Sequence, residues 1–370
     1  MRREEPLLAF VGPMSSGKSS LIGRLLLRNN VISSYALADA KKDALALGDE
    51  DRVFALLVDE GLRERMDGHT YTMRFVGRLR LGDTNLRLID TPGDLRYLRE
   101  ILSGICVSDV LALVIGKGKA KEGLIRFYLD IARLHEEECI VILNDVHANE
   151  IEEAVLKSLK SEYDDVILTV CEVSAIEGRG LRGLEEALSD IRPKRRESKE
   201  LRMPVLKIAG DSGVLVGVIT HGRLSVDEEV LISPTYKVGT VCSIERGGES
   251  LSNALAGDDV GILLKGIGRQ YVKPGNIVGS LKGPPPRALS VRLRVMRGIE
   301  NLMVGKRLMA FSHATRVGCR ISEIRGDEVT VIFDEPIAIE SYDDYKELGI
   351  LVLMSATAIS AYGVCEEVVT

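Results

Sequence analysis

Hydrophobic and polar positions follow two different patterns along this chain. In the first half, runs that are apolar at nearly every position alternate with segments whose apolar residues recur every three or four positions. The runs are typical of strands buried on both faces, and the segments are typical of amphipathic helices. The expected strands are Leu7–Val11, Leu86–Asp90, Val110–Ile115, Cys139–Leu143 and Val166–Val173, and the expected helices are Ser19–Arg28, Leu95–Ile105, Leu124–Glu138 and Glu150–Leu159. This alternation predicts an α/β domain with a doubly wound, mostly parallel sheet.

From Pro204 onward the helical pattern is lost. Short alternating runs are separated by Gly, Asp and Ser, and three consecutive prolines, Pro284–Pro286, divide them into two groups. Closely spaced strands without helices predict small all-β barrels. The expected strands here are Val214–Ile219, Glu229–Ile232, Thr240–Ile244, Val260–Leu264, Ala288–Met296, Val329–Phe333, Leu348–Met354 and Ala358–Val364. We therefore expect a multidomain protein: an α/β domain (1–192), an exposed charged linker (193–203) and two β-barrel domains (204–283 and 284–370).

Composition narrows the class of protein. Lys plus Arg number 49 against 55 Asp plus Glu, a formal net charge of −6. This balance excludes a strongly basic chromatin-type protein, and we expect no DNA partner. No stretch approaches 18 uninterrupted apolar residues, so no membrane partner is expected. The six cysteines lie far apart in the sequence, which favours reduced thiols in a cytoplasmic protein over disulfides or zinc. We expect this protein to be a monomer.

The most specific signal is a glycine-rich loop directly after the first strand. Residues 12–19 read G-P-M-S-S-G-K-S and fit the phosphate-loop pattern G-x-x-x-x-G-K-[ST] at each fixed position. Backbone N–H groups in such a loop surround phosphate oxygens at a helix N-terminus. Lys18 would bridge the β- and γ-phosphates, and the Ser19 hydroxyl would ligate Mg²⁺. The expected nucleotide-binding residues of this loop are Gly12, Ser15, Ser16, Gly17, Lys18, Ser19 and Ser20.

A second motif, D-T-P-G at residues 90–93, ends another buried strand. Its position places the Asp90 carboxylate beside the phosphates, where it would hold Mg²⁺ through water. The Gly93 N–H would donate to a γ-phosphate. Because this motif follows a complete phosphate loop, we interpret it as a phosphate-sensing switch rather than a simple turn.

These motifs resemble those of the translational GTPases of the elongation factor Tu, elongation factor 1-alpha and selenocysteine-specific elongation factor type. The segment Glu64–Thr70 is similar to their first switch, and this resemblance makes Thr70 a further Mg²⁺ ligand. Ser174 and Ala175 match the loop that contacts the base. Gly210–Gly213, Ser243–Glu245 and Lys273–Gly275 are similar to the family's second domain, and Val329–Ile339 and Ala361–Val364 to its third.

Two departures concern hydrolysis. The family reads D-T-P-G-H, with a histidine that helps to position the attacking water, whereas this chain has Asp94 there. An ionised carboxylate near a γ-phosphate is repelled, and losing one positioning group lowers a rate by about two decades or more. His69 stands where the family has an apolar residue. We therefore treat Asp94 and His69 as the candidate catalytic residues and expect slow hydrolysis.

A third departure concerns the base. The guanine motif N-K-x-D is replaced by Asn144-Asp145-Val146-His147. A neutral His147 accepts one hydrogen bond where the family's aspartate accepts two. An unmet buried donor costs about 1–3 kcal/mol, so guanine discrimination should weaken by one to two decades. Asp145 is an alternative acceptor. GTP and GDP nevertheless remain the expected ligands because of the surrounding motifs.

The resemblance also implies a tRNA-binding surface. Glu245 matches the glutamate against which the terminal adenosine of tRNA packs. Eight Lys or Arg lie between residues 287 and 320 against one acid, Glu300, and such a basic strip suits an RNA backbone. Solvated faces of alternating strands give the same pattern. The candidate RNA-binding residues are Glu245, Arg292, Arg294, Arg316 and Arg320.

The motifs together predict a GTP-binding translation factor that uses Mg²⁺ and binds tRNA, aminoacylated in the family, in a nucleotide-dependent way. The ribosome is an expected second partner and a stimulus for hydrolysis. Two alternatives stay open. One is a nucleotide-binding paralogue that does not hydrolyse GTP. The other is a carrier of a protein partner, such as a release or rescue factor or the GTPase subunit of a sulfate-activating enzyme.

Overall fold

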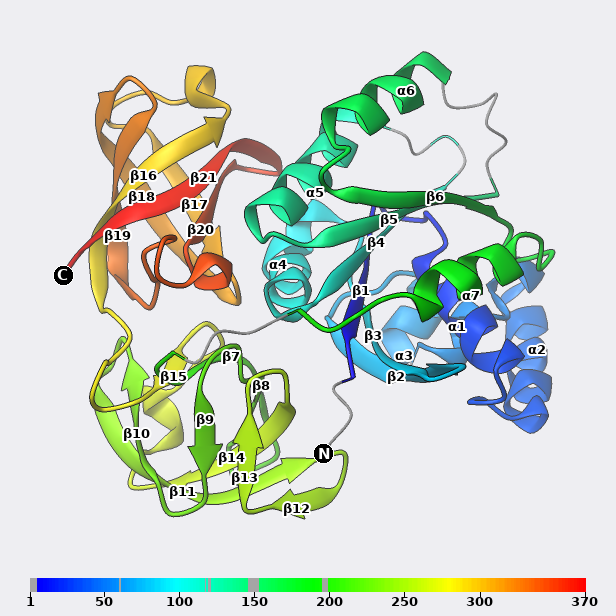
Figure 1. Cartoon of the computed structure of the whole chain (residues 1–370), viewed down its shortest axis with the longest axis horizontal. Coiled ribbons are helices and arrows are strands. Elements are labelled where there is room, and N and C mark those ends of the chain that lie inside the picture. The colour runs from blue at the N-terminus through cyan, green and yellow to red at the C-terminus, as the bar shows by residue number, and fades with distance from the viewer. Residues whose placement is uncertain (1–4, 60, 117, 119–120, 146–152, 195–198) are drawn as a thin grey trace. The chain divides into compact units, whose positions relative to one another are not determined.

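A computed structural model of the chain describes residues 5–59, 61–116, 118, 121–145, 153–194 and 199–370 (Figure 1). Its internal contacts separate two units, Met1–Lys194 and Arg195–Thr370. The first unit carries the α/β elements and the second carries the β elements that follow them. Each unit is described by itself.

The first unit is built on a six-stranded sheet in the order β2-β3-β1-β4-β5-β6. Its strands are β1 (Leu7–Val11), β2 (Arg74–Leu81), β3 (Thr84–Asp90), β4 (Val110–Gly116), β5 (Glu138–Asn144) and β6 (Ile167–Val173). β2 runs antiparallel to β3, and the other neighbours are parallel. The predicted doubly wound, mostly parallel sheet is therefore confirmed. The strands β1 and β4 are buried at every position, which is why they read as continuous apolar runs.

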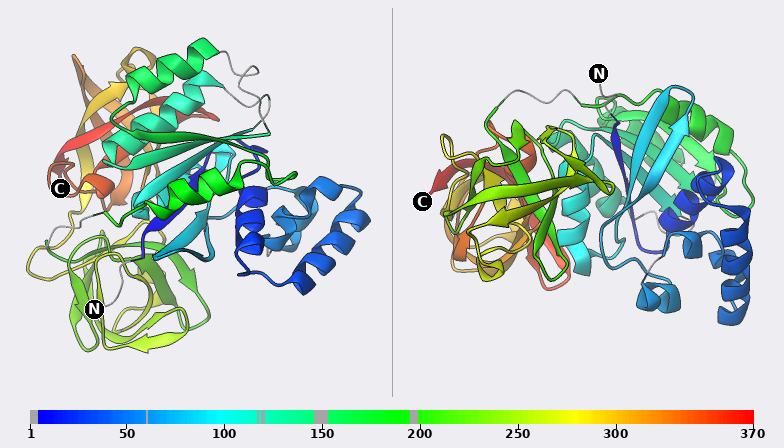
Figure 2. Two further views of the ribbon diagram at one scale, coloured as in Figure 1. Left: turned by 45° about the vertical axis from the view of Figure 1, so that its right-hand side comes forward. Right: turned by 90° about the horizontal axis from the view of Figure 1, so that it is seen from below.

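Helices cover both faces of this sheet (Figures 1 and 2). They are α1 (Lys18–Arg28), α2 (Ser34–Leu47), α3 (Leu62–Asp67), α4 (Leu98–Val107), α5 (Glu122–Leu134), α6 (Glu153–Glu162) and α7 (Leu181–Ser189), with 3₁₀ turns η1 (Glu50–Arg52), η2 (Ala55–Leu57) and η3 (Leu95–Tyr97). Leu21 and Leu25 of α1 share a core with Leu184 of α7 and with Leu8 and Phe10 of β1. This core anchors the start of α1 at the end of β1.

Two predicted helix boundaries are wrong. The helix expected over Leu95–Ile105 is the turn η3 followed by α4, because the Asp94 side chain accepts a hydrogen bond from the Arg96 N–H and caps the turn. The helix expected to reach Glu138 ends at Leu134, because Glu136 adopts a left-handed φ of 52°. The predicted start of the next helix, Glu150, lies outside the described residues.

The second unit begins with a seven-stranded antiparallel sheet in the order β10-β15-β7-β8-β14-β11-β12. Because β10 also pairs with β11, six of these strands form a ring. The strands of this sheet are β7 (Arg202–Ala209), β8 (Val214–Val218), β10 (Glu229–Ser233), β11 (Lys237–Arg246), β12 (Glu249–Leu251), β14 (Asp259–Lys265) and β15 (Ile277–Gly279), with turn η5 (Arg269–Tyr271). A separate two-stranded sheet pairs β9 (Arg223–Ser225) with β13 (Asn253–Leu255).

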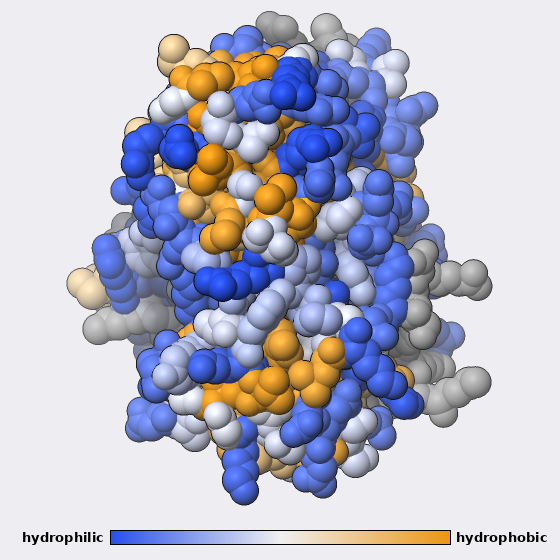
Figure 3. Space-filling model, turned by 90° about the vertical axis from the view of Figure 1, so that its left-hand side faces the viewer, coloured by the Kyte–Doolittle hydropathy of each residue, from blue (hydrophilic) through white to orange (hydrophobic). Residues whose placement is uncertain are grey.

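The chain ends in a closed barrel in the order β16-β19-β18-β17-β20-β21. Its elements are β16 (Ala288–Arg297), η6 (Ile299–Asn301), β17 (Arg307–Ser312), β18 (Thr315–Arg325), β19 (Glu328–Ile337), η7 (Lys346–Leu348), β20 (Ile350–Ser355) and β21 (Ala358–Val369). Inward residues of β16 such as Val291 and Leu293 alternate with exposed Arg292 and Arg294. Apolar patches remain outside, and Figure 3 shows them interrupted by hydrophilic residues.

The predicted linker is exposed over only part of its length. Leu201 and Met203 are buried, and Arg202 begins β7 with its guanidinium donating to Glu340. This partner lies 138 residues away in the sequence, so the local charge pattern gave no sign of it. Residues 195–198 lie outside the described residues. The described cysteines are all free, and the described helices are each too short or too polar to cross a bilayer.

Candidate nucleotide site

The phosphate loop connects β1 to α1, and its backbone requires glycine at two positions. A Cβ atom on Gly12, whose φ is 137°, would lie 2.2 Å from the carbonyl oxygen of Val114 on β4. A Cβ on Gly17, whose φ is 86°, would lie 2.1 Å from the Asn144 side-chain nitrogen. The loop is thus pressed between two neighbouring strand ends. Only residues without a side chain fit there.

Lys18 is the buried cation of this loop. Its Nζ donates to the carbonyl oxygens of Gly12 and Pro13, at 3.0 Å each. Burial lowers the pKa of Lys18 to about 8, and the charge of Asp90 partly offsets this effect. The first turn of α1 holds no acidic residue, and its N-terminus has no side-chain cap. An anion at this helix end would therefore meet both the helix dipole and an ammonium group.

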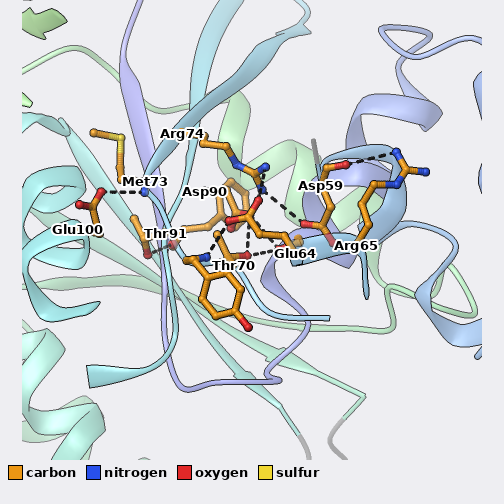
Figure 4. Close-up of polar contacts among 12 residues, drawn as sticks. Asp59, Glu64, Arg65, Thr70, Met73, Arg74, Asp90, Thr91 and Glu100 are labelled. Atoms are coloured by element: carbon orange, nitrogen blue, oxygen red, sulfur yellow. Dashed lines mark hydrogen bonds and ion pairs between the residues drawn. The ribbon is translucent and has the colours of Figure 1, made fainter. Parts of the chain in front are cut away.

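Oxygen atoms of three side chains from separate segments converge near Lys18. Figure 4 shows two of these side chains, Thr70 and Asp90. The Ser19 hydroxyl lies 2.8 Å from Asp90 Oδ2 and 3.1 Å from the Thr70 hydroxyl, which is 3.3 Å from the same carboxylate oxygen. These three residues are the Mg²⁺ ligands expected from the sequence. Asp90 Oδ1 is buried and has no hydrogen-bond partner among the described residues.

Hard oxygen ligands of this kind suit Mg²⁺, which is commonly bound by one or two carboxylates together with substrate phosphates. The described residues contain no group of three His, Cys, Asp or Glu able to hold a metal ion by themselves. The arrangement therefore fits a metal ion shared between the protein and a phosphate chain. Burial raises the pKa of Asp90, while Lys18, Ser19, Arg74 and Thr70 oppose this rise.

The second switch motif packs on the phosphate loop. The Thr91 hydroxyl donates to the Phe10 carbonyl at 2.7 Å. A Cβ on Gly93 would lie 2.6 Å from Lys18 Nζ and equally close to the Met14 nitrogen. The motif therefore lies directly against the two groups that would hold the terminal phosphate.

Asp94 is engaged rather than free. Its Oδ1 accepts the Arg96 N–H at 2.9 Å, and its Oδ2 pairs with the Arg96 guanidinium at 2.5 Å. These bonds lower the pKa of Asp94. The predicted negative charge at this position is therefore present, but the Arg96 guanidinium, which no sequence motif indicated, compensates it. His69 is half-buried, and its electrostatic effect is a minor further cause of the lowered pKa of Asp94.

Asn144 joins three segments on the base side of the site. Its Nδ2 donates to the Ser16 carbonyl at 3.1 Å, and its Oδ1 accepts the Ala175 N–H at 3.0 Å. The Ser174 hydroxyl accepts from the Glu177 N–H and so closes the turn beyond it. Asp145 has a φ of 55°. His147 lies outside the described residues.

A cavity of about 540 Å³ unites these groups. Predicted site residues that line it are Ser15, Ser16, Gly17, Lys18, Ser19, Ser20, His69, Thr70, Gly93, Asp94, Asn144, Asp145 and Ala175. Gly12, Asp90 and Ser174 are buried and are not among the residues that line the cavity. Arg52, Tyr71, Arg96 and Tyr97 also line the cavity, and none of these was singled out from the sequence. The Tyr71 and Tyr97 rings, 5.2 Å apart, join the two switch segments.

The candidate RNA-binding residues lie in the second unit. Glu245 is exposed on β11. Arg292 pairs with Glu367 at 2.6 Å and Arg294 with Glu366 at 3.0 Å, both across the β16–β21 pair. Sequence analysis counted only one acid in this strip because the neutralising carboxylates come from the last strand. For Arg316 and Arg320, the described residues offer no ion pair, and Arg316 lies over the Phe311 ring.

Fold and site together define a P-loop nucleotide-binding protein whose α/β domain precedes two β domains. A family model identifies its family. The family model described as Elongation factor Tu GTP binding domain matches residues 4–194. The elongation factor 1-alpha of Metallosphaera sedula is 26% identical over 420 residues, which cover 98% of this chain and 96% of that protein. This chain belongs to the translational GTPases of the elongation factor Tu type, a GTP-binding family of translation factors.

Solved structures share the fold over nearly the whole chain. The elongation factor SelB of Methanococcus maripaludis, in complex with the GTP analogue GppNHp, has a TM-score of 0.74 at 18% identity and covers all of this chain and 80% of its own. A bacterial selenocysteine-specific elongation factor has a TM-score of 0.73 at 20% identity over 98% of this chain. This chain spans 58% of the length of that bacterial protein.

Proposed function

We propose that this chain is a GTP-binding translation factor that binds tRNA in a nucleotide-dependent way and hydrolyses GTP slowly. The observation that carries the proposal is the convergence of Ser19, Thr70 and Asp90 beside the buried Lys18. Family membership supports GTP as the ligand. Lys18 and the backbone N–H groups of the loop bind the phosphates, and Gly93 contacts the terminal one. Mg²⁺ held by Ser19, Thr70 and Asp90 would neutralise charge on the phosphate chain.

Calorimetric titration with GTP, GDP and ATP tests the nucleotide. We expect GTP and GDP to bind more tightly than ATP, but by a margin about one to two decades smaller than the family motif would give, because Asn144-Asp145-Val146-His147 offers guanine fewer acceptors. Lys18→Ala should abolish binding, since it removes the buried cation. Unchanged nucleotide uptake by this variant would refute the proposal. Equal affinity for ATP would refute guanine as the base.

Slow hydrolysis follows from the Asp94–Arg96 pair, which occupies the place of the family's water-positioning histidine. Both oxygens of the Asp94 carboxylate accept from Arg96, and an ionised carboxylate is repelled by a γ-phosphate, so Asp94 does not replace the histidine that positions the water. In single-turnover assays of phosphate release, Asp94→His should be at least about tenfold faster than wild type. Asp94→Asn is the matched control, because it removes the charge without supplying an imidazole. Equal rates for the histidine and asparagine variants would contradict the water-positioning argument.

The RNA-binding surface is proposed on the second unit, with Glu245 against the tRNA end and arginines against the backbone. Arg316 and Arg320 should contribute most, because Arg292 and Arg294 are already paired with Glu367 and Glu366. Substituting Gln at both 316 and 320 should reduce the salt dependence of tRNA affinity by about one to two phosphate contacts. The same change at 292 and 294 is the control and should have less effect. The opposite ranking would place the RNA elsewhere.

Nucleotide dependence is tested with the same tRNA probe. Affinity measured with GDP should be lower than affinity measured with a non-hydrolysable GTP analogue, and equal affinities would contradict nucleotide control. The ribosome is proposed as a second partner that accelerates hydrolysis. Phosphate release in the presence and absence of ribosomes measures this effect, and an unchanged rate would argue against it.

A further inference from the structure

Four charged side chains are buried together next to the Thr70 segment (Figure 4). Asp59 precedes α3, Glu64 belongs to α3, Arg74 begins β2 and Asp90 ends β3. The exposure of the Arg74 side chain is 14%, and that of each carboxylate is 7% or less. Charged groups almost never reach such burial without partners. Their contacts therefore reveal what holds this part of the site together.

Arg74 is the cation within this group of three carboxylates. Its Nη1 lies 2.7 Å from Glu64 Oε2, and its Nη2 lies 3.4 Å from Asp59 Oδ1 and 3.8 Å from Asp90 Oδ2. The last atom is the one that also accepts from the hydroxyls of Ser19 and Thr70. Arg74 thus supplies positive charge to the carboxylate of the metal site in addition to Lys18.

Glu64 connects Arg74 to the backbone of the first switch segment. While its Oε2 pairs with Arg74, its Oε1 accepts the backbone N–H of Tyr71 at 2.8 Å. Tyr71 directly follows Thr70, so the bond fixes the backbone that carries the Thr70 hydroxyl. The helix of Glu64 is itself anchored, because the Arg52 guanidinium donates to the carbonyls of Glu64, Arg65 and Met66 at its end.

We infer that Arg74 and Glu64 are positioning residues that hold Thr70 at the metal site before nucleotide binds. This inference rests on the proposed function and adds a statement about how that site is assembled. A segment fixed by buried ion pairs does not need a terminal phosphate to order it. Nucleotide-dependent change then falls to other parts of the site, such as the Gly93 loop. The structural reason is local: no residue of the Arg74–Glu64–Tyr71 chain of contacts belongs to the phosphate loop.

Hydrogen exchange of a peptide that contains Tyr71 tests this inference on the full chain. In wild type, the peptide should be protected to within about twofold in the nucleotide-free protein and in the presence of GDP with Mg²⁺. Arg74→Gln should accelerate exchange of the nucleotide-free form by at least about tenfold, because it leaves Glu64 and Asp59 without their cation. Glu64→Gln keeps an acceptor for Tyr71 but loses the charge pair, and should give a smaller acceleration. Arg78→Gln, which removes a half-exposed arginine from the same strand, is the control and should leave exchange unchanged.

A second readout separates positioning from a general loss of stability. The Mg²⁺ concentration that half-maximally slows GDP dissociation should rise by about tenfold in Arg74→Gln, because Thr70 is no longer placed as a ligand. A purely structural role would leave this midpoint unchanged and would overturn the inference. If Arg74→Gln does not fold, Arg74→Lys and Glu64→Gln replace it in both measurements.

The inference is also overturned if the wild-type peptide exchanges freely without nucleotide and is protected only after GDP and Mg²⁺ are added. Calorimetry on the same preparations keeps the two proposals apart. Failure to bind GDP would refute the proposed function, whereas the exchange rates of the nucleotide-free protein would still decide whether Arg74 and Glu64 hold the Thr70 segment.

Discussion

Position 93 has no room for a side chain. A Cβ atom there would lie 2.6 Å from Lys18 Nζ, the Met14 nitrogen and the Pro13 carbonyl oxygen. Two of these three atoms belong to the phosphate loop backbone, which cannot move without disturbing the loop. Overpacking of this kind costs about 1–3 kcal/mol. A larger residue at position 93 would therefore displace the groups that would bind phosphate.

We therefore predict that Gly93→Ala weakens GDP binding by about tenfold or more, because about 1.4 kcal/mol corresponds to one decade of affinity. Calorimetric titration measures the change. Gly123→Ala is the matched control, since a Cβ on Gly123 meets nothing within 4 Å. Equal affinities in the two variants would show that the loop tolerates the methyl group.

His313 gives a pH-dependent prediction. Its ring is buried, Nδ1 accepts the Ala314 N–H at 2.7 Å and Nε2 donates to the Ala338 carbonyl at 2.9 Å. Burial lowers the pKa of His313 to about 4 from 6.5. Between pH 6.5 and 4, His313 is therefore protonated in the unfolded chain but stays neutral in the folded chain. The contribution to stability is complete above pH 6.5 and is lost as the pH falls toward 4.

This difference corresponds to about 3 kcal/mol of unfolding free energy. Urea denaturation at pH 7 and pH 4.5, with unfolding of the second unit as the signal, measures it. His313→Gln should be less stable than wild type at pH 7 but should lose less stability on acidification. A variant that follows the wild-type pH curve in parallel would contradict the assignment to His313.

At the scale of elements, sequence patterns predicted strands better than helix ends. β4 is fully buried, so its run from Val110 was found to within one residue of its observed end. The break between η3 and α4 depends on the Asp94 cap, and the end of α5 depends on the backbone of Glu136. Neither the cap nor the backbone conformation alters the spacing of apolar residues from which the helices were predicted. The strands β2 and β18 were missed because their exposed faces carry arginine or glutamate at several alternating positions.

The candidate site was predicted where one motif fixes both the residue type and the backbone. Lys18, Ser19 and Asp90 belong to such motifs, and Thr70 followed from a resemblance in the first switch. Arg74 and Glu64 were not predicted, because their roles arise from contacts between α3 and the edge strand β2, ten residues apart in the sequence. Arg96 belongs to no motif, and its ion pair with Asp94 depends on the backbone of the η3 turn, which the apolar pattern does not specify.

At the scale of the whole molecule, the two units, divided between Lys194 and Arg195, share no core: the main core of the first unit is built from its own residues, and the second unit has two cores, one in each β domain. The nucleotide cavity is lined by residues of the first unit. A ligand that binds one folded unit stabilises that unit by mass action, by about 2.7 kcal/mol at a hundredfold excess over Kd.

We predict two calorimetric unfolding transitions, of which GDP with Mg²⁺ raises only the one that belongs to the α/β unit. Near-ultraviolet signals do not separate the units well in a chain without Trp, so proteolysis at each transition assigns them. Lys18→Ala should abolish the GDP-induced shift and leave the second transition in place. A shift of both transitions by GDP would show that the units unfold together.

The two hydrogen bonds of the Asn144 side chain bear on which nucleotides the site can bind. This side chain ties the Ser16 carbonyl to the Ala175 amide and fills the space beside Gly17, all within the protein. The geometry of the loop around a pyrophosphate therefore does not depend on which ring system sits at the far end of the nucleotide. A change of base should therefore leave the affinity for the pyrophosphate group unchanged.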